Sequence, residues 1–263
     1  MKNNYTKKDM LGSPDRFGYE WNRYSEIIPD YEKQFLKWIF PLSKKSFKNK
    51  KVLDAGCGTG RNSFWPLKYG AKEVFSFDYN IKTVTAAKRN LRNFKNSKVL
   101  FNSIYEIDYK DKFDITFSIG VIHHLEDPRE AIKKMVSATK KNGIVLIWVY
   151  GYEGNEWIVR YVNPLRKITS RLPVFATHLL SYVCSVPLYF YLKFFKQNHP
   201  YFKQLSNFRF WHVHSIVFDQ LIPKIANYWR ENEAKALFQN QGLKNIKSFH
   251  VNNNSWTVVG IRK

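Results

Sequence analysis

The stretch VLDAGCGTGRN, residues 52–62, decides the fold. Two apolar residues lead into a carboxylate, Asp54, and glycine then occupies every second position at Gly56, Gly58 and Gly60. Glycine permits left-handed backbone and lets the main chain approach a ligand closely. A buried strand that ends in such a loop is typical of the ligand-binding edge of an α/β sheet.

The chain after Lys51 alternates between strand and helix patterns. Short apolar runs predict strands at 51–56, 73–78, 98–103, 113–120 and 144–150. Amphipathic runs with stop signals predict helices at 61–70, 80–94, 127–143 and 231–242. Such alternation predicts parallel crossovers and an α/β sheet. The turn residues between 243–251 and 255–263 predict a final antiparallel pair.

These patterns divide the chain into three parts. Residues 1–50 are polar and aromatic, with helical spacing near 31–39, and are expected to form an N-terminal helical cap. Residues 51–150 and 231–263 form the predicted ligand-binding core. Residues 151–230 break the alternation and form a basic, aromatic insertion between the fifth and sixth predicted strands.

Composition limits the partners and the compartment. The 263 residues carry a net charge of +22, which favours an anionic partner, while a lysine-rich bias of the whole proteome is the alternative. Two distant cysteines, Cys57 and Cys184, indicate a reducing compartment. Residues 1–10 lack the apolar run of a secretory signal, so the expected location is the cytoplasm, with peripheral contact at the inner membrane surface as an alternative.

An acidic residue, Asp78, ends the second predicted strand, where a carboxylate can bind ribose hydroxyls. Nicotinamide-dependent oxidoreductases share this layout but use G-x-G-x-x-G. Here Arg61 stands near the later glycine position, and Asp54 lies inside the motif, where it would repel a pyrophosphate. A ligand that carries an ammonium or sulfonium group fits the carboxylate better.

Together these residues resemble the class I S-adenosylmethionine-dependent methyltransferases, in the small-molecule branch that includes the type 11 and ubiquinone-biosynthesis-like enzymes. The resemblance rests on VLDAGCGTGR, on Asp78, and on FDITFSIGVIHHLEDP followed by NGIVLIWVY. It implies a Rossmann-like, doubly wound sheet of seven strands with an antiparallel last strand and a helical lid insertion. It also implies S-adenosylmethionine as the cofactor.

By position, the resemblance implies a set of cofactor-binding residues: Asp54, Gly56, Cys57, Gly58, Gly60, Asp78, Tyr79, Ser103, Ile104, Ser118 and Ile119. Asp78 would bind both ribose hydroxyls and Tyr79 would lie against the adenine. Asp54 would lie near the methionine end. Ser103 stands where the family often has an aspartate.

His123 and His124 follow the fourth strand and are the candidate catalytic residues. A histidine there could remove a proton from the acceptor, because its pKa lies near working pH. Packing or hydrogen bonding within the loop is the alternative. The sequence SIGV, 118–121, replaces the Asn/Asp-Pro-Pro-aromatic motif of relatives that methylate exocyclic amines, which favours a small-molecule acceptor.

The predicted lid contains no acidic residue from 157 to 218. Its arginines, with Arg160 and Arg166 as the candidate substrate-binding residues, suit an anionic and partly apolar acceptor such as a nucleotide sugar, a lipid-linked sugar or an aromatic metabolite. Tyr19 and Trp21 are further substrate-site candidates that would cover the cofactor, with packing as the alternative.

Residues 174–192 carry no formal charge. A membrane span is rejected because it would separate the last two strands from their sheet. A helix here would place Phe175, Leu179 and Val183 on one face, which predicts packing on the domain or on a second copy in a homodimer. Membrane-surface contact through 174–196 is the alternative. HVH at 212–214 lacks a third ligand, so no metal is expected.

Four functions compete at this stage. A small-molecule methyltransferase leads, and nucleic acid is an unlikely partner because the sequence carries no recognisable RNA-binding module. An RNA methyltransferase, prompted by the charge, is the alternative and would bind with steep salt dependence. A non-catalytic relative that binds the cofactor comes third, and a nicotinamide oxidoreductase last.

Overall fold

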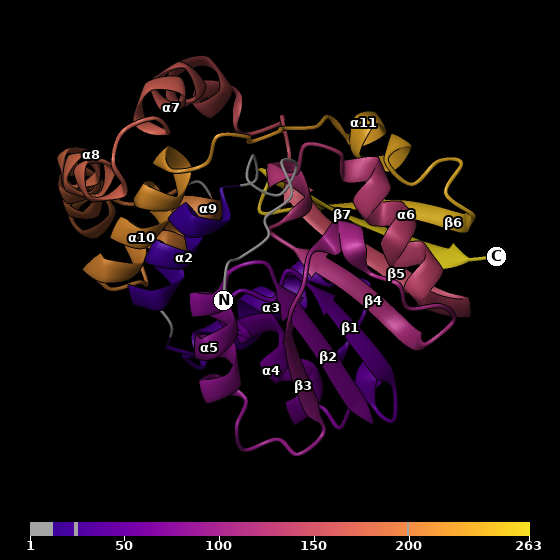
Figure 1. The fold of residues 1–263 in the computed structure, drawn as a ribbon. Helices are drawn as coiled ribbons and strands as arrows, with labels where there is room; N and C mark the ends of the chain where they lie inside the picture. Colours follow the sequence, from indigo (N-terminus) through magenta and orange to yellow (C-terminus); the bar gives the residue numbers. More distant parts are fainter. Residues whose placement is uncertain (1–12, 24–25, 199) are drawn as a thin grey trace.

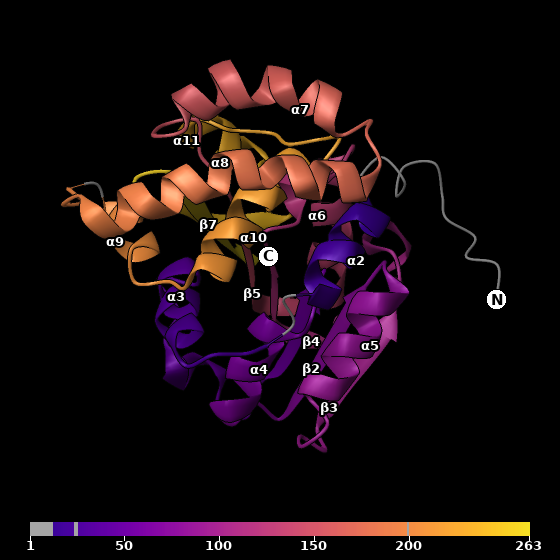
Figure 2. The same ribbon diagram turned by 90° about the vertical axis from the view of Figure 1, so that its left-hand side faces the viewer.

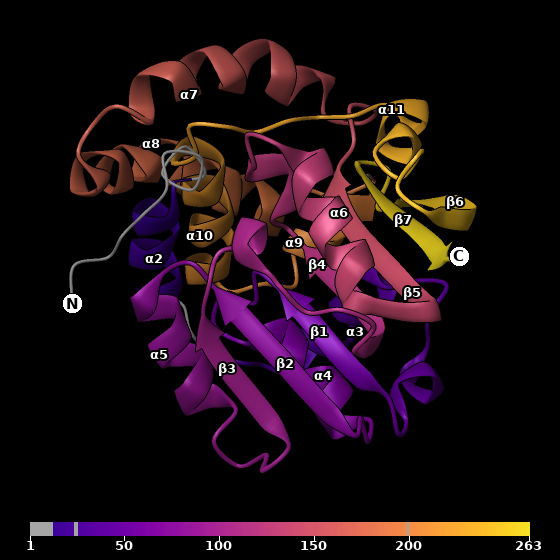
Figure 3. The same ribbon diagram turned by 45° about the vertical axis from the view of Figure 1, so that its right-hand side comes forward.

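A computed structural model describes residues 13–23, 26–198 and 200–263, and at positions 19–23 and 200 it describes the backbone alone. A single seven-stranded sheet in the order β3-β2-β1-β4-β5-β7-β6 forms the centre of the fold (Figure 1 and Figure 3). The first five strands run parallel, and β7 pairs antiparallel with both β5 and β6. The predicted seven-stranded Rossmann-like sheet is confirmed.

The strands are β1 Lys51–Ala55, β2 Glu73–Asp78, β3 Ser97–Phe101, β4 Phe113–Ile119, β5 Thr139–Tyr150, β6 Leu243–Val251 and β7 Ser255–Arg262. The helices of the N-terminal part and the sheet layers are α2 Pro14–Arg23, α3 Asp30–Trp38, η1 Lys44–Phe47, α4 Arg61–Lys68, α5 Ile81–Asn90, η2 Ile104–Glu106, η3 Ile122–His124, α6 Pro128–Ala138 and α11 Glu231–Ala236. The helices of the insertion are η4 Ile158–Val162, α7 Asn163–Thr169, α8 Val174–Phe194, α9 Pro200–Leu205 and α10 Phe210–Leu221.

Helices cover both faces of the sheet, because its strands are apolar on both sides. One face packs against α6 and α11, where Met135 and Phe238 are fully buried. The other packs against α3, η1 and α4, with Phe35 and Phe47 fully buried. The order of the strands reverses between β1 and β4, so the carboxyl ends of these strands open a crevice at that point.

The boundary between α6 and β5 differs from the expected one. The helix was expected to run to Gly143, but it ends at Ala138 and the strand begins at Thr139. The β-branched Thr139 donates a hydrogen bond to the Met135 carbonyl, and its hydroxyl lies 2.8 Å from that of Thr116 on β4. The Asn142-Gly143 pair, read as a helix stop, instead lies in an irregular start of the strand, with Asn142 in the left-handed region.

The insertion between β5 and β6 folds as helices that lie across the carboxyl edge of the sheet (Figure 2). We call its helical part, residues 157–221, the lid. Helices α8 and α10 pack against each other, with α8 on the outer side and α10 toward the sheet. Between them, Ser185 hydrogen bonds to Nδ1 of His214 at 2.8 Å, and His178 lies 3.3 Å from the other ring nitrogen of His214.

Helix α8 is therefore packed with its polar side inward. Thr177, Ser181 and Ser185 are buried, whereas Phe175 is 69% exposed and Phe194 is 76% exposed. The expectation that the apolar face packs on the domain is wrong, because the hydroxyl and imidazole groups need hydrogen-bond partners that α10 supplies. Within the described residues, α8 is the one helix long and apolar enough to cross a membrane by length and composition.

The N-terminal helix α2 is fixed to the lid by a single side chain. Arg16 donates hydrogen bonds to the main-chain carbonyls of Thr169, Leu172 and Ile222 at 2.7–2.9 Å. It also donates to the hydroxyl of Thr177 at 3.1 Å. An arginine is a donor with no acceptor capacity, so these four acceptors satisfy most of its N–H groups.

Candidate active site

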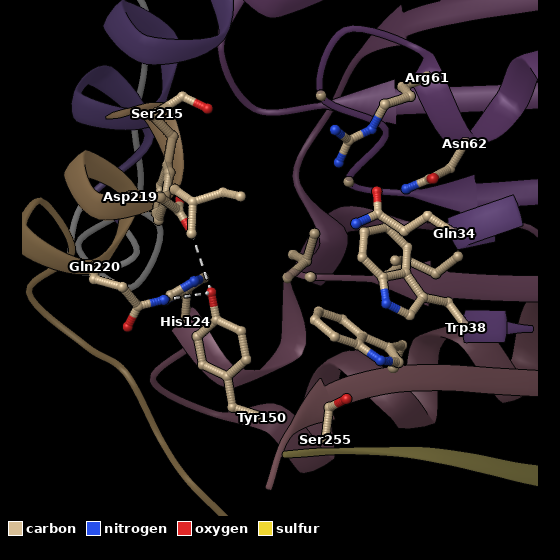
Figure 4. Close-up of a pocket in the computed structure, with 18 of the residues that line it drawn as sticks. Gln34, Trp38, Arg61, Asn62, His124, Tyr150, Ser215, Asp219, Gln220 and Ser255 are labelled. Atoms are coloured by element: carbon tan, nitrogen blue, oxygen red, sulfur yellow. Dashed lines mark hydrogen bonds between the residues drawn. The ribbon is translucent and has the colours of Figure 1, made fainter. Parts of the chain in front are cut away.

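A cavity of about 380 Å³ lies between the carboxyl edge of the sheet and the lid (Figure 4). The loops after β1, β2, β3 and β4 form its floor, and helices α9 and α10 form the facing wall. Phe17 of α2 and Trp38 of α3 close two of its sides. Residues from every part of the described chain therefore meet at the switch in strand order.

The glycine loop turns sharply under this cavity. Gly56, Gly58 and Gly60 all have positive φ, of 81°, 53° and 79°. At Gly56 a Cβ atom would lie 2.5 Å from a methyl carbon of Val121, so a side chain there would clash. Gly56, Cys57 and Gly58 line the cavity, whereas Gly60 precedes α4 and lies outside the lining.

Asp78 ends β2 and lines the cavity, where it shapes the glycine loop. Its Oδ2 accepts a hydrogen bond from the Gly58 N–H at 2.9 Å, and its Oδ1 accepts from Thr83 Oγ1 at 2.7 Å and from the Asn80 N–H at 3.1 Å. Burial raises the pKa of this carboxyl above its usual value, and the Thr83 bond opposes that shift. The Tyr79 N–H also bonds to this carboxylate, so Asp78 is held firmly at the edge of the cavity, where the motif predicts a ribose ligand.

Asp54 lies beneath the loop and does not line the cavity. It is fully buried, accepts a 2.6 Å hydrogen bond from Ser63 on α4, and has its pKa raised to about 7 by burial. Ser76 in turn donates to the Ser63 hydroxyl. The other oxygen of Asp54 has no hydrogen-bond partner among the described residues. Because Asp54 is buried outside the cavity lining, the structure gives it a place under the loop and not the expected contact with the methionine end.

Some of the remaining predicted cofactor-binding residues line the cavity, and the others are buried behind its lining. Tyr79, Ile104 and Ile119 line the cavity, and Tyr79 stacks on Phe101. Ser103 and Ser118 are fully buried behind the lining. The Ser103 hydroxyl caps η2, and the Ser118 hydroxyl donates to the Ala55 carbonyl at 2.7 Å, so both hold neighbouring loops in place.

Arg61, which the motif analysis did not assign to the cofactor, is the only lysine or arginine among the described residues that line the cavity. Its guanidinium lies 4.5 Å from the centre of the Tyr31 ring. Since S-adenosylmethionine ends in a carboxylate, an arginine beside the glycine loop is a suitable partner for it. The left-handed glycines, Asp78 and Arg61 together fit this cofactor.

The two candidate catalytic histidines occupy different places. His123 is fully buried, stacks on Tyr150 and does not line the cavity, and burial lowers its pKa well below the usual value. His124 lines the cavity, and its Nδ1 lies 2.8 Å from the Ile225 carbonyl. That contact requires a proton on Nδ1 and leaves Nε2 as the acceptor. Burial lowers the pKa of His124 to about 3, so its ring is neutral.

The lid wall contributes a hydrogen-bonded cluster that motif reasoning missed. Tyr150 donates from its hydroxyl to Asp219 Oδ2 at 3.1 Å, and the Gln220 amide donates to the Tyr150 hydroxyl at 3.3 Å (Figure 4). Behind them, Arg166 donates to the Gln220 side-chain oxygen at 3.0 Å. The sequence held one signal for this cluster, because Asp219 is the single acidic residue in 157–230.

The predicted substrate-binding residues are mostly placed elsewhere. Arg166 is only 4% exposed and its donors are used within the lid, so its expected contact with substrate is replaced by a supporting role. Arg160 is exposed and lies outside the cavity lining. The side chains of Tyr19 and Trp21 lie outside the described residues. No group of three possible metal ligands occurs in the described part of the chain.

The sheet order, the left-handed glycine loop and the carboxylate after β2 define a class I S-adenosylmethionine-dependent methyltransferase domain. Comparison with known proteins agrees: residues 46–157 match a family model described as a methyltransferase domain. The predicted methyltransferase family is thereby confirmed over these residues, and the cavity described above fits its expected cofactor.

Two solved structures share the fold. A S-adenosylmethionine-dependent methyltransferase from Aquifex aeolicus has a TM-score of 0.52 at 13% identity, over 98% of this chain and 100% of that one. Magnesium protoporphyrin IX methyltransferase from Synechocystis, with bound S-adenosylhomocysteine, has a TM-score of 0.53 at 12% identity, over 95% and 86% of the two chains. Likeness at this identity concerns the fold.

One sequence relative carries an RNA substrate in its name. A tRNA U34 carboxymethyltransferase from Campylobacter hominis is 33% identical over 141 residues, which is 51% of this chain and 48% of the relative. The matched part of the chain thus spans about half the length of this relative. The prediction that nucleic acid is an unlikely partner is wrong in the light of this match and of similar ones. The comparisons lend no support to the homodimer or the membrane contact through 174–196.

Proposed function

We propose that this protein transfers a group from S-adenosylmethionine to RNA, with a transfer RNA nucleoside as the acceptor class. The relatives named tRNA U34 carboxymethyltransferases support an RNA acceptor. A transfer RNA substrate also agrees with a cytoplasmic protein. The observation that carries the proposal is the charge of the lid next to the cavity.

The lid offers cations and aromatic rings, and residues 157–218 contain no acidic side chain. Its exposed cations are Arg160, Lys167, Arg171, Lys193, Lys196, Lys203 and Arg209. Trp157 both lines the cavity and is half exposed, so its ring lies at the cavity mouth. Cations bind the phosphate backbone and aromatic faces stack on unpaired bases, the combination that holds single-stranded nucleic acid. A nucleoside turned out of its stack would enter the cavity beneath.

The residues of the sheet edge have separable tasks in this reaction. Asp78 would hold the ribose of the cofactor, Arg61 its carboxylate, and Tyr79 its adenine. When bound, S-adenosylmethionine supplies a sulfonium whose attached carbon is open to nucleophilic attack. The facing walls, with Phe17, Trp38 and helix α10, exclude water and align the acceptor with that carbon.

The test is a transfer assay with the full chain. Purified protein and methyl-labelled S-adenosylmethionine are added to an extract of the source cells, which is then separated into RNA, lipid and small soluble molecules. We expect ribonuclease-sensitive label in the RNA fraction. Label confined to the lipid or the soluble pool would overturn the RNA acceptor.

Two controls sharpen this assay. The Asp78→Ala variant should transfer nothing, because it lacks the predicted ribose ligand. Mass spectrometry of the digested nucleosides then identifies the transferred group, since the relatives are named for a carboxymethyl group. A methyl group on a tRNA nucleoside would separate this protein from them in donor chemistry.

A further inference from the structure

The lid holds one carboxylate, and the fold places it inside the cavity. Asp219 is the only acidic residue in 157–230, a stretch rich in lysine and arginine. It lies on the α10 wall, half-buried, and lines the cavity across from the glycine loop (Figure 4). Asp78 is the only other acidic residue among the described residues of the lining. A carboxylate held in a cavity in this way is typical of a functional site.

A chain of hydrogen bonds fixes the direction of the Tyr150 proton. Arg166 can only donate, so the Gln220 oxygen that accepts from it must point toward it. The Gln220 amide nitrogen then points to the Tyr150 hydroxyl and donates to its oxygen. Tyr150 consequently donates its own proton to Asp219. The carboxylate is held in one orientation from behind.

Among the described residues that line this part of the cavity, the phenols beside Asp219 are poor proton acceptors. Burial raises the pKa of Tyr150, Tyr201 and Tyr228, and the negative charge of Asp219 adds to each shift, so all three phenols stay protonated. His124 is neutral, and burial lowers its pKa to about 3. Among the described residues, Asp219 is therefore the one acidic side chain that this wall presents to the cavity, and His212 is the other titratable group of α10 in the lining.

We propose that Asp219 is the proton acceptor of the transfer reaction and that the acceptor molecule presents an O–H or N–H group to it. This inference rests on the proposed function of the cavity. The acceptor atom gives its proton to the Asp219 carboxylate and forms the new bond to the transferred carbon. The carbon–sulfur bond breaks, its electron pair stays on sulfur to give a neutral thioether, and Asp219 later loses the proton to water.

Tyr150 acts as the positioning residue for Asp219, and His124 as a neutral part of the cavity wall. A rival explanation is that Asp219 only fastens the lid to β5 through the Tyr150 hydroxyl. Asp219→Asn separates the two, because an asparagine oxygen still accepts from Tyr150 but cannot take up a proton. Loss of general base catalysis costs about a hundredfold or more in rate.

The experiment measures transfer from labelled S-adenosylmethionine by the full chain, using the extract fraction that wild-type protein labels. We expect Asp219→Asn to lower kcat at least about a hundredfold. Its Kd for S-adenosylhomocysteine by calorimetry and its Tm should match the wild type. Asp108→Asn, which removes an exposed carboxylate far from the cavity lining, is the matched control and should keep full activity.

The outcomes separate this inference from the choice of acceptor. If Asp219→Asn keeps kcat within about threefold of the wild type, Asp219 only holds the lid to β5 through Tyr150, and the inference fails. If its Tm falls, Asp219→Glu decides: recovery to within about tenfold of wild type supports a base, and inactivity in a folded protein overturns it. Label in a non-RNA pool, still lost in Asp219→Asn, overturns the RNA acceptor alone. No transfer by wild type to any pool overturns both.

Discussion

In the sheet, strand β4 buries Phe113 and Phe117 completely, whereas in the lid, helix α8 leaves Phe175, Val183 and Phe194 about two-thirds exposed or more. The two regions use apolar residues in opposite ways. The sheet closes its own core on both faces. The lid buries a small apolar cluster of Leu192, Leu205, Phe208 and Val213, and its helix α8 turns hydroxyl and imidazole groups inward and rings outward.

The match to known methyltransferases ends close to the boundary between the sheet and the lid. The methyltransferase model ends at residue 157, where the lid begins. The matched part carries the glycine loop and Asp78, which we propose bind the cofactor, while the lid carries Asp219 and the exposed cations. On this proposal the shared region serves the donor, and the role of the lid has to be interpreted from its own contacts.

The largest effect expected from this contrast is a loss of stability in the sheet. Phe117→Ala should lower the free energy of unfolding by about 3–5 kcal/mol, because it leaves a cavity in a fully buried site. Denaturant titration followed by circular dichroism measures it. A loss below about 1 kcal/mol would mean that the sheet core collapses around the gap and is not close-packed.

The next effect depends on pH and concerns Asp54. Its pKa is raised from 3.8 to about 7, so its protonated form stabilises the fold below pH 4, and that stability is lost as pH rises toward 7. The free energy of unfolding of Asp54→Asn, relative to that of the wild type, should therefore rise by about 4 kcal/mol between pH 4 and pH 7. His124, whose pKa of about 3 has the opposite effect, is common to both proteins and cancels. Unfolding curves at both pH values measure the difference, and parallel curves would contradict burial of the charge.

Cofactor affinity gives the third test of the shared region. Asp78→Ala should weaken binding of S-adenosylhomocysteine by about a hundredfold or more, since two hydrogen bonds to a charged group are lost. Asp78→Asn keeps one acceptor oxygen and should lose less. Calorimetry at constant pH provides both values, and unchanged affinity in Asp78→Ala would remove this residue from the site.

The lid should show a smaller effect that depends on salt. The triple variant Lys167→Glu, Lys196→Glu, Lys203→Glu should bind fluorescent tRNA about tenfold more weakly, and the slope of log affinity against log salt should shrink by about 0.7 for each lost contact. The matched reversal of Lys88, Lys95 and Lys110, which are exposed on the sheet part, should change little. Equal losses in both variants would mean that net charge alone, and not the lid, attracts RNA.

The smallest effect completes the contrast with β4. Phe194→Ala should change the free energy of unfolding by no more than about 0.5 kcal/mol, because the ring is already in solvent. The measurement is the same denaturant titration as for Phe117→Ala. A loss of 2 kcal/mol would show that the apolar face of α8 is covered in solution.

Sequence patterns predicted the sheet and its glycine loop because both depend on local signals. Alternation of apolar runs fixes the strands, and glycine at three spaced positions fixes a left-handed loop. The α8 orientation was missed because periodicity shows which residues share a face and not which face is buried. Asp219 was missed because its partner Tyr150 lies 69 residues away, a pairing that only the fold creates.

The hydrogen bonds of Arg16 bear on how products leave the cavity. One side chain ties α2 to the main chain of the lid, and Asn80 ties the same helix to the sheet part by donating to the Pro14 carbonyl. A lid that opens to release spent cofactor and product must therefore break the Arg16 bonds. The strength of these bonds would then set the residence time of the products, through a helix whose Phe17 itself lines the cavity.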